Sequence, residues 1–554
     1  MNIKNALLSV LFCSTILSLS GQLASDQAIV HMDKPYYVSG EMAWFQVYLP
    51  EVFRPVSGYV QVLIQNQGGK VVDDYFWTLS DAKIDGYYRI PYNIDPDLYH
   101  FSVRALDNNS KEPITITSWS VPIYSDLSAD GMQAIYPERS IYDADRSTLS
   151  VVVSTDQSSY GRNDQVSLDI NLPQGVNAEA LSISVTDLSL IGPAAESNIF
   201  LTDIAIPANV TLGINDQTFV HGTISNAETD EPVSIGVIGA YHAKYNKMHY
   251  TKSNDAGKFT LMLKDHVGDG QLQFAGNLYD LFEDTGVKLF TPSITNKYAL
   301  TSTYDDDIIS YLKESNARKR IYQFYKELES NATFMEMKEL ERLEVKPNKQ
   351  VNVKEYVTFE NTGLFFNEVL SFVVDFRQKG DDITARMFDP QTTRGGRVYS
   401  DNSFPRSPVF IIDGKLTKNA AFVYNLKLTD INEVSVYNDW RDITKQYGTF
   451  GDFGYVVINT SQSDLEIPQE DQEDIVTYSG LGRQADYPIS LVEDEKEAPK
   501  LSPTVYWSPK ASSGKISFRS SDDVGEFLVK VVVRDKTGKI GITSTTYKAV
   551  RRAN

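Results

Sequence analysis

The chain has 554 residues, which is enough for three to five domains of ordinary size. It carries 73 acidic and 52 basic residues, a formal charge of −21, so nucleic acids and anionic membrane surfaces would be repelled. Apolar residues make up 42% of the chain, and its 32 tyrosines and 26 phenylalanines favour β-structure.

The first 21 residues are typical of a secretory signal peptide. Lys4 supplies the positive charge, Ala6–Leu19 is mostly apolar, and small residues follow up to Gly21. The apolar stretch is shorter than the roughly 20 residues that a spanning helix needs. No later stretch is long and apolar enough to span either. We therefore expect export, cleavage near Gly21, and no transmembrane segment in the mature protein.

The single cysteine, Cys13, lies inside this apolar stretch. A lipid anchor on Cys13 would need a small residue before it, whereas Phe12 stands there; lipidation is the alternative to simple cleavage. If cleavage occurs near Gly21, the mature chain has no cysteine. Disulfides, thiolate nucleophiles and cysteine-based metal sites are then excluded together.

Val30–Pro50 recurs without gaps as Val153–Pro173. The matches include Asp33 with Asp156, Tyr37 with Tyr160, and Leu49-Pro50 with Leu172-Pro173. In both copies a turn-rich segment precedes a run in which every second residue is apolar, as in a strand that buries one face. The repeat predicts two related β-domains in tandem, at residues 24–127 and 128–213.

Met32–Glu41 followed by a strand resembles the entry of the macroglobulin domain of alpha-2-macroglobulin-like proteins, in a form common in cell-envelope proteins of Bacteroidota. Asp85–Tyr88 and Tyr99–Val103 stand where that family has later strands. The resemblance implies an immunoglobulin-like sandwich of about seven strands. In the second copy, Ala180–Asp187 shows the same similarity. That copy is degenerate, because Gln157-Ser158 and Asn163-Asp164 replace Lys34-Pro35 and Gly40-Glu41.

Residues 214–292 predict a third β-module. Val220–Ile224, Gly236–Tyr241 and Asn254–Leu261 give strand, strand, and an Asn-Asp-x-Gly hairpin into a further strand. This order resembles the carboxypeptidase regulatory-like domain, which implies a small, non-catalytic β-sandwich. No zinc-binding HxxE pair accompanies it.

A helical connector is expected over residues 301–350. Its apolar positions near helical spacing are Ile308, Tyr311, Leu312, Ile321, Phe324, Tyr325 and Leu328. Asp305–Asp307 could bind a cation, but we interpret it as a cluster at the helix N-terminus, where carboxylates suit the helix dipole.

Residues 354–461 predict a small α+β module. Ser407–Lys415 indicates a buried strand and an Asp-Gly turn, Leu428–Tyr437 a turn capped by Thr429 and a strand, and Tyr447–Thr460 a Gly-rich bend and a strand. This order resembles the plug domain of SusC-type TonB-dependent transporters. Only 94 residues follow Thr460, too few for a transporter barrel, so we expect no import through this chain.

An acidic linker is expected at 464–498 and a four-stranded C-terminal β-sheet at 501–550. This end also resembles Bacteroidota proteins that combine macroglobulin and plug domains. The predicted fold class is therefore mainly β, with tandem immunoglobulin-like sandwiches, a small α+β plug-like domain and a short helical connector.

The sequence predicts no catalytic, cofactor-binding or metal-binding residues and no cofactor. The six histidines, His31, His100, His221, His242, His249 and His266, show no HExxH or HxH spacing. His242 and His249 would point to opposite faces of one strand unless a turn intervenes. The glycines of Gly448–Gly454 fit a β-bend better than a phosphate loop. No Cys-Gly-Glu-Gln-like thioester motif is present.

The aromatic run Tyr36, Tyr37, Trp44 and Phe45 could form a glycan-stacking face, but we interpret it mainly as core. The function expected is that of a non-enzymatic, exported scaffold in the periplasm or at the outer membrane, with the cell surface as an alternative. Its partner would be an outer-membrane or periplasmic protein, as part of an outer-membrane or secretion-related complex, bound through the plug-like module. The alternative is a thioester-less macroglobulin-like protease inhibitor, and an enzyme with a site in residues 300–400 is the least expected. Oligomeric state and partner identity stay open.

Overall fold

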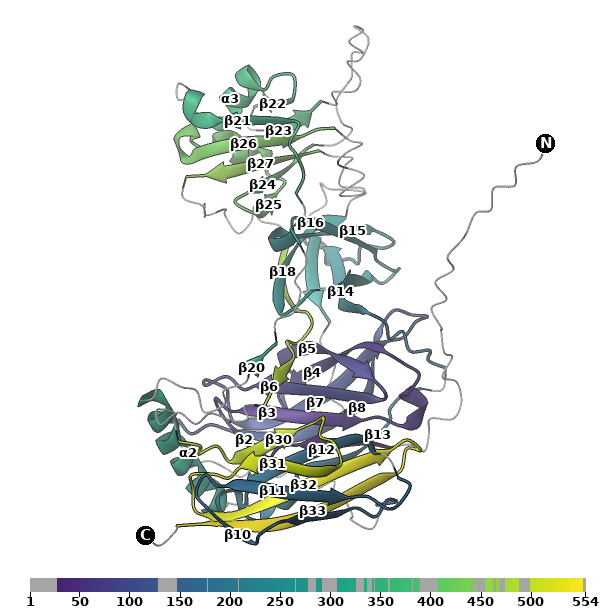
Figure 1. Cartoon of the computed structure of the whole chain (residues 1–554). Helices are drawn as coiled ribbons and strands as arrows, with labels where there is room; N and C mark the ends of the chain where they lie inside the picture. The colour runs from purple at the N-terminus through teal and green to yellow at the C-terminus, as the bar shows by residue number, and fades with distance from the viewer. Residues whose placement is uncertain are drawn as a thin grey trace, which may run out of the picture. The chain divides into compact units, whose positions relative to one another are not determined.

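The computed structural model describes residues 27–127, 147–277, 285–290, 306–324, 333–335, 341–356, 359–388, 407–439, 443, 454–461, 465, 467, 474–487 and 499–551, except positions 177, 208, 265, 343 and 381. The chain is mainly β, as predicted. It forms two compact units: unit 1 comprises residues 1–216, 291–337 and 482–554, and unit 2 comprises 217–290 and 338–481 (Figure 1). No helix in the described ranges is long and apolar enough to cross a membrane. The predicted signal peptide lies outside the described residues.

The first sandwich of unit 1 is one continuous sheet that encloses a single apolar core. Its strands are β1 (Gln27–Met32), β2 (Tyr37–Val38), β3 (Met42–Tyr48), β4 (Gly58–Gln65), β5 (Val71–Ser80), β6 (Lys83–Arg89), β7 (Asp97–Leu106), β8 (Pro113–Tyr124) and β13 (Ile199–Asp203). Their order is β13-β1-β3-β6-β5-β4-β7-β8-β2. Phe45, Phe101 and Trp119 lie within ring-contact distance of one another at its centre.

Strand β13 was predicted as part of the second sandwich, but it belongs to the first. It pairs antiparallel with β1, placing Phe200 opposite Val30, and Thr202 contacts Thr117 of β8 at 2.7 Å between hydroxyl oxygens. Phe200 is buried in the first core. Without β13, the outer edge of β1 would leave backbone N–H and C=O groups unpaired. Pairing with β13 provides hydrogen-bond partners for these groups and buries Phe200 of β13 in the first core.

The second sandwich of unit 1 combines strands from two distant parts of the chain. Its strands are β9 (Val152–Thr155), β10 (Ser159–Gly161), β11 (Gln165–Asn171), β12 (Ala178–Asp187), β30 (Thr504–Ser508), β31 (Gly514–Arg519), β32 (Gly525–Asp535) and β33 (Ile540–Val550). They form the sheets β10-β33-β32-β12-β30 and β31-β11-β9. The sequence predicted a separate β-sheet at 501–550. These strands instead belong to the second sandwich. They complete the sandwich that residues 128–213 begin, because neither set alone covers the shared core.

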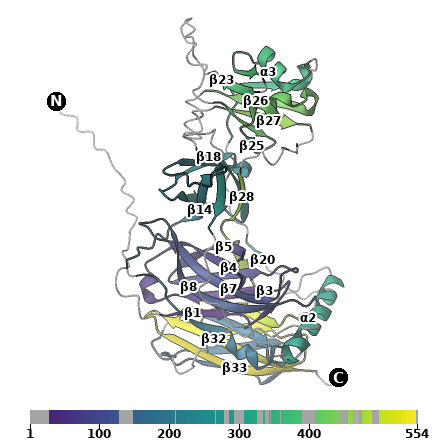
Figure 2. The same ribbon diagram turned by 180° about the vertical axis from the view of Figure 1, so that it is seen from behind.

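Helical elements of unit 1 lie beside these sandwiches. After β12 come α1 (Leu188–Ile191) and the 3-10 turn η4 (Gly192–Ser197). The predicted connector contains α2 (Asp306–Phe324), seen in Figure 2 at the side of the two sandwiches. Ile308, Tyr311 and Leu312 of α2 are buried, as predicted, but Ile321 and Phe324 are exposed. Strands β20 (Thr333–Phe334) and β29 (Ala485–Asp486) pair with each other.

Unit 2 contains a small β-sandwich. Its strands are β14 (Gln217–Asn226), β15 (Val237–His242), β16 (Lys247–Lys252), β17 (Lys258–Lys264), β18 (Asp269–Asn277), β19 (Thr285–Leu289) and β28 (Asp474–Ser479). They form the sheets β17-β14-β19 and β16-β15-β18-β28 around one core. The predicted Asn-Asp-x-Gly turn is present, with the Asn254 side chain accepting from Ala256 N and Lys258 N. Strand β28 corrects the prediction of a solvated linker at 464–498, because residues 474–479 alternate between inward and outward positions along β18.

The α+β module of unit 2 corresponds to the predicted plug-like segment. Its elements are β21 (Lys349–Asn352), α3 (Thr362–Val369), β22 (Val374–Lys379), β23 (Asp382–Met387), β24 (Val409–Ile412), β25 (Lys415–Thr417), α4 (Ala420–Asn425), β26 (Ile431–Tyr437) and β27 (Tyr455–Thr460). The main sheet runs β21-β26-β27-β24-β25, with β24 and β27 parallel.

Of two turns predicted in this module, one is confirmed and the other is formed differently. The Asp-Gly turn is present, with positive φ at Asp413 and Gly414, as a two-residue hairpin loop requires. Thr429 does not cap the next turn, because Lys427 occupies the cap position and the Thr429 hydroxyl contacts Asp430 instead. The predicted Gly-rich bend at 448–453 lies outside the described residues.

Candidate functional site

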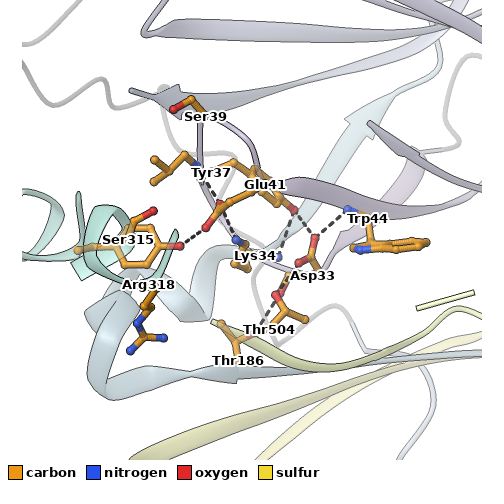
Figure 3. A network of polar contacts seen from close by, with 12 residues as sticks. Asp33, Lys34, Tyr37, Ser39, Glu41, Trp44, Thr186, Ser315, Arg318 and Thr504 are labelled. Atoms are coloured by element: carbon orange, nitrogen blue, oxygen red, sulfur yellow. Dashed lines mark hydrogen bonds and ion pairs between the residues drawn. The ribbon is translucent and has the colours of Figure 1, made fainter. Parts of the chain in front are cut away.

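A buried polar network is built on the entry turn of the first sandwich, residues 33–41 (Figure 3). One carboxylate oxygen of Asp33 accepts from the Tyr37 hydroxyl at 2.5 Å and from Trp44 N at 2.8 Å. The other accepts from the Thr504 hydroxyl at 2.5 Å, and the Thr186 hydroxyl donates to Asp33 O at 2.9 Å. Burial raises the pKa of Asp33, although Lys34 and these donors act in the opposite direction.

A buried ion pair closes the same turn. Lys34 Nζ lies 2.6 Å from Glu41 Oε2, and both side chains are at most 3% exposed. Glu41 Oε2 also accepts from Val38 N at 2.8 Å, while Glu41 Oε1 accepts from the Tyr311 hydroxyl of α2. The pair is therefore both charge-compensated and hydrogen-bonded, which is the condition under which a buried ion pair is tolerated.

Lys319 of helix α2 forms a buried ion pair beside this turn and a hydrogen bond to it. Lys319 Nζ lies 2.7 Å from Asp126 Oδ2 and also donates to Ser39 O. Asp126 further accepts from the Ser39 hydroxyl at 3.1 Å and from the Ser315 hydroxyl at 3.4 Å. The entry turn and the segment after β8 are thus both bonded to one helix.

Arg318 connects α2 to the second sandwich. Its guanidinium forms an ion pair with Asp523 at 2.7 Å and donates to Leu501 O. Tyr322 of the same helix accepts from Leu501 N at 2.9 Å. The network therefore joins four segments that are distant in sequence: the entry turn, the end of β8, helix α2 and the stretch before β30. Its donors and acceptors are used in contacts within the chain, so this arrangement stabilises and positions segments.

The second copy of the repeat has the same local geometry. The Asp156 carboxylate accepts from the Tyr160 hydroxyl at 2.5 Å and from Ser167 N at 3.1 Å, and Asp164 accepts from Gly161 N at 2.6 Å. β2 pairs in parallel with β8, and β10 likewise with β33. The structure thus confirms the sequence repeat at the level of individual hydrogen bonds. In this copy, however, Asp156 is exposed.

The six histidines lie at four places. His31 is fully buried between the hydroxyls of Ser182 at 2.6 Å and Ser184 at 3.0 Å. Burial, with a smaller effect of Lys530, lowers the pKa of His31 to about 3. A Ser–His contact of this length resembles that of a nucleophile and its base. Because His31 and both serines are at most 1% exposed, no substrate can reach them in this conformation.

His100 contacts the Ser120 hydroxyl and His221 contacts the Thr260 hydroxyl, each within one sheet. His242, His249 and His266 instead lie together in unit 2, since the turn η5 (Ala243–Tyr245) intervenes between β15 and β16. In the described part of the chain, no group of three His, Cys, Asp or Glu residues is arranged to hold a metal ion.

The aromatic run of the first sandwich is core. Tyr36, Tyr37, Trp44 and Phe45 are each at most 4% exposed, so they offer no glycan-stacking face. Tyr36 packs edge-on against Tyr124 and Tyr311, and Trp44 contacts Tyr487. The sequence predicted neither Lys319, Arg318 nor Asp126 as site residues. A signal for Arg318 and Lys319 was present in the sequence: polar side chains at 315, 318 and 319 fall on the same helical face as the apolar ones. The buried positions of α2 are 308, 311, 312, 315, 318, 319 and 322.

No protein-family model and no curated protein matches the chain in sequence. Solved structures to which it is similar include Salmonella alpha-2-macroglobulin reacted with methylamine and E. coli alpha-2-macroglobulin in its native conformation. Each is 9% identical with a TM-score of 0.22, and each alignment covers 97% of this chain and 40% of the other. E. coli alpha-2-macroglobulin activated by porcine elastase is 10% identical over 95% of this chain and 44% of that one, also with a TM-score of 0.22. The chain spans less than half the length of these proteins, and TM-scores of 0.22 assign it no activity.

Proposed function

We propose that this protein is an exported, non-enzymatic scaffold of a bacterial cell envelope that binds an outer-membrane protein through its plug-like module, residues 354–461. The observation that supports a scaffold is that charged side chains of unit 1 are buried and bond to other segments of the same chain. Asp33, Lys34, Glu41 and Lys319 are all buried and bonded to other parts of the chain. Such a network holds sandwiches together and has no group free to act on a substrate.

The binding surface is assigned from the exposed apolar residues of the plug-like module. Helix α3 buries Phe365 and Phe366 completely in the module core. Leu364 on the same helix is 38% exposed, and Phe372, in the turn that follows, is 91% exposed. A fully exposed phenylalanine gains nothing in folding, whereas aromatic side chains are frequent anchors in protein interfaces. Within the module, α3 lies at the end opposite β25 (Figures 1 and 2).

A site-specific crosslink tests this assignment. A photoreactive phenylalanine analogue placed at Phe372 should, in producing cells, give an adduct with one envelope protein. The matched control carries the analogue at Lys515, an exposed position of β31 in unit 1, and should not give that adduct. No adduct from position 372, or the same adduct from both positions, would refute docking through this surface.

A second function, protease inhibition by a thioester-less macroglobulin-like protein, is favoured by the duplicated entry turn. Two sandwiches that share the Asp–Tyr hydrogen bond indicate a repeated module of the kind that the sequence resemblance implies. Such an inhibitor should reduce the activity of broad-specificity proteases toward large substrates after incubation. Unchanged protease activity would eliminate this alternative and leave the scaffold proposal untouched.

A further inference from the structure

Three histidines of unit 2 pack against one another in the interior. His242, at the end of β15, stacks on His266 with ring centroids 5.0 Å apart, and His249 of β16 meets His266 edge-on at 5.3 Å. All three are at most 8% exposed. Tyr245 of η5 also contacts His242 and His266. His242, Tyr245 and His249 lie on β15, η5 and β16, and His266 lies between β17 and β18.

Tyr478 attaches strand β28 to this histidine cluster. Its hydroxyl lies 2.9 Å from His242 Nε2 and 3.0 Å from His266 Nδ1. A hydroxyl donates only one hydrogen, so it donates to one ring while the other ring donates to its oxygen. The ring that accepts from Tyr478 must be neutral, because a doubly protonated ring has no acceptor nitrogen. Nε2 of His249 and of His266 have no hydrogen-bond partner among the described residues.

The surroundings of the histidine cluster oppose a positive charge. Burial is the main cause that lowers the pKa of His242 to about 4 and those of His249 and His266 to about 3. The described charged groups acting on the rings are Lys244 of η5 and Lys247 of β16, both cationic, together with the other histidines. The remaining titratable groups facing the rings are Tyr245 and Tyr478.

Among the described residues, the backbone ladder of β28 runs along β18, and Asp474 at its start accepts from Val287 N of β19 at 2.7 Å. Strand β28 pairs antiparallel with β18, from Asp269 opposite Ser479 to Phe274 opposite Asp474, and is the edge of its sheet. Tyr478 lies over Gly270, where a Cβ would come within 2.7 Å of the ring. Leu481 N donates to His266 O at 2.8 Å just beyond the strand. Tyr478 and Leu481 therefore bond the edge strand and a residue just beyond its end to His242 and His266.

We propose that His242, His249 and His266 form an acid-sensitive latch, in which proton uptake by the imidazoles releases strand β28 from β18. Protonation of the accepting ring removes the acceptor of the Tyr478 hydroxyl, and protonation of any of the three rings places a cation near Lys244 or Lys247. Water around the rings would replace the lost hydrogen bond and stabilise the positive charge. Water reaches the rings when the Tyr478 side chain moves away from His242 and His266. Release leaves the backbone of β18 unpaired along that edge, where another strand could add.

The direction of the pH effect follows from linkage. Each histidine takes up a proton near pH 6.5 when solvated but only near pH 3–4 when latched. The stability of the latched form is therefore complete above pH 6.5 and is lost as the pH falls toward 4. At pH 5 the opening equilibrium should rise by about 30-fold, relative to pH 7.5, for each histidine that becomes solvated.

Hydrogen–deuterium exchange of the full-length protein, corrected for intrinsic rates, tests the latch between pH 7.5 and 5. Amides of β18 and β28 should open with an uptake that approaches two to three protons per event near pH 5, while peptides of the first sandwich serve as the internal reference. His249→Gln should remove about one proton from this uptake. His221→Gln is the matched control, because His221 lies on β14 in the same sandwich and outside the cluster; it should leave the uptake unchanged.

Tyr478→Phe separates packing from titration. It removes the bridging hydroxyl but no titrating imidazole, so opening should increase at every pH while most of the proton uptake remains. If the histidine variant does not fold, the slope measured on the unmodified protein decides alone. Opening of β28 that is independent of pH, or an equal loss of proton uptake in His221→Gln, would overturn the proposal.

Discussion

The two entry turns of unit 1 have the same hydrogen bonds and opposite surroundings. Asp33 and Asp156 each accept from a tyrosine hydroxyl at 2.5 Å and from a strand amide. Asp33 is 1% exposed beneath Thr504, whereas Asp156 is exposed to solvent. Their pKa values move in opposite directions: burial raises that of Asp33, and the hydrogen bond from Tyr160 lowers that of Asp156.

The difference shows how one motif can have two roles. In the first copy Lys34 and Glu41 form a buried ion pair that meets Tyr311 of α2. In the second copy Gln157 is exposed, and the Asp164 carboxylate accepts from Gly161 N of its own turn. The turn geometry is thus intrinsic to the repeat. Its use as a joint depends on the partner that covers it.

The largest effect is expected from removing Lys34. Lys34→Met leaves the buried carboxylate of Glu41 without its counter-charge, which should lower the free energy of unfolding of unit 1 by about 3–5 kcal/mol. Gln157→Met, the equivalent change in the exposed copy, should alter it by less than about 0.5 kcal/mol. Urea unfolding followed by tryptophan fluorescence measures both, since four of the five tryptophans lie in unit 1. Equal effects would mean that the two turns do not differ as described.

Removing Lys319 should have the next largest effect. Lys319→Met leaves Asp126 buried without a cation and should cost about 2–3 kcal/mol, with faster amide exchange throughout α2. Lys313→Met on the exposed face of α2 is the control and should be nearly neutral. A neutral Lys319→Met would show that the Lys319–Asp126 ion pair does not hold α2.

The carboxylates of the two turns should respond to pH with opposite signs. Since the folded pKa of Asp33 is raised, wild-type stability decreases as pH rises from 3.8 through that pKa, and Asp33→Asn removes this component. Since the folded pKa of Asp156 is lowered, its contribution is present above pH 3.8 and disappears below it. At pH 7, Asp33→Asn should cost about 1–2 kcal/mol through weakened hydrogen bonds. Unfolding of the wild type, Asp33→Asn and Asp156→Asn from about pH 2.5 to pH 7 gives the two signs; the same sign for both aspartates would contradict their assigned environments.

The smallest effect is expected from copying the ion pair into the exposed turn. Gln157→Lys places a cation near Asp164, as Lys34 lies near Glu41. Because this turn is solvated, the gain should be at most about 0.5 kcal/mol and should vanish in high salt. A gain of 2 kcal/mol or more, measured by urea unfolding, would show that burial is not what distinguishes the copies.

Local patterns predicted most strands but not the distant pairings. Alternation identified Phe45, Val47, Leu168 and Ile170 as inward residues, and all four are buried. Alternation carries no information about which sheet completes a core. The sandwich that Leu168 begins is closed by Phe518, about 350 positions away, and the edge beside β18 is closed by β28. The separate domains predicted at 128–213 and 501–550 therefore form one sandwich.

The candidate site was only partly predictable for a related reason. The motif gave Asp33, Tyr37 and Glu41 as turn residues. Helical spacing gave the apolar side of α2 but not Lys319, because a long charged side chain on an amphipathic helix normally indicates solvent. Its burial depends on Asp126, which lies at the other end of the first sandwich in sequence.

A double-mutant cycle between Lys319 and Asp126 tests the central claim, that buried ionic contacts join α2 to the first sandwich beside its entry turn, most directly. The cycle compares Lys319→Met, Asp126→Asn and the double variant by urea unfolding. The joint predicts a coupling free energy above about 1.5 kcal/mol, as for contacting buried charges. A coupling below about 0.5 kcal/mol would contradict it, because the two residues would then act independently.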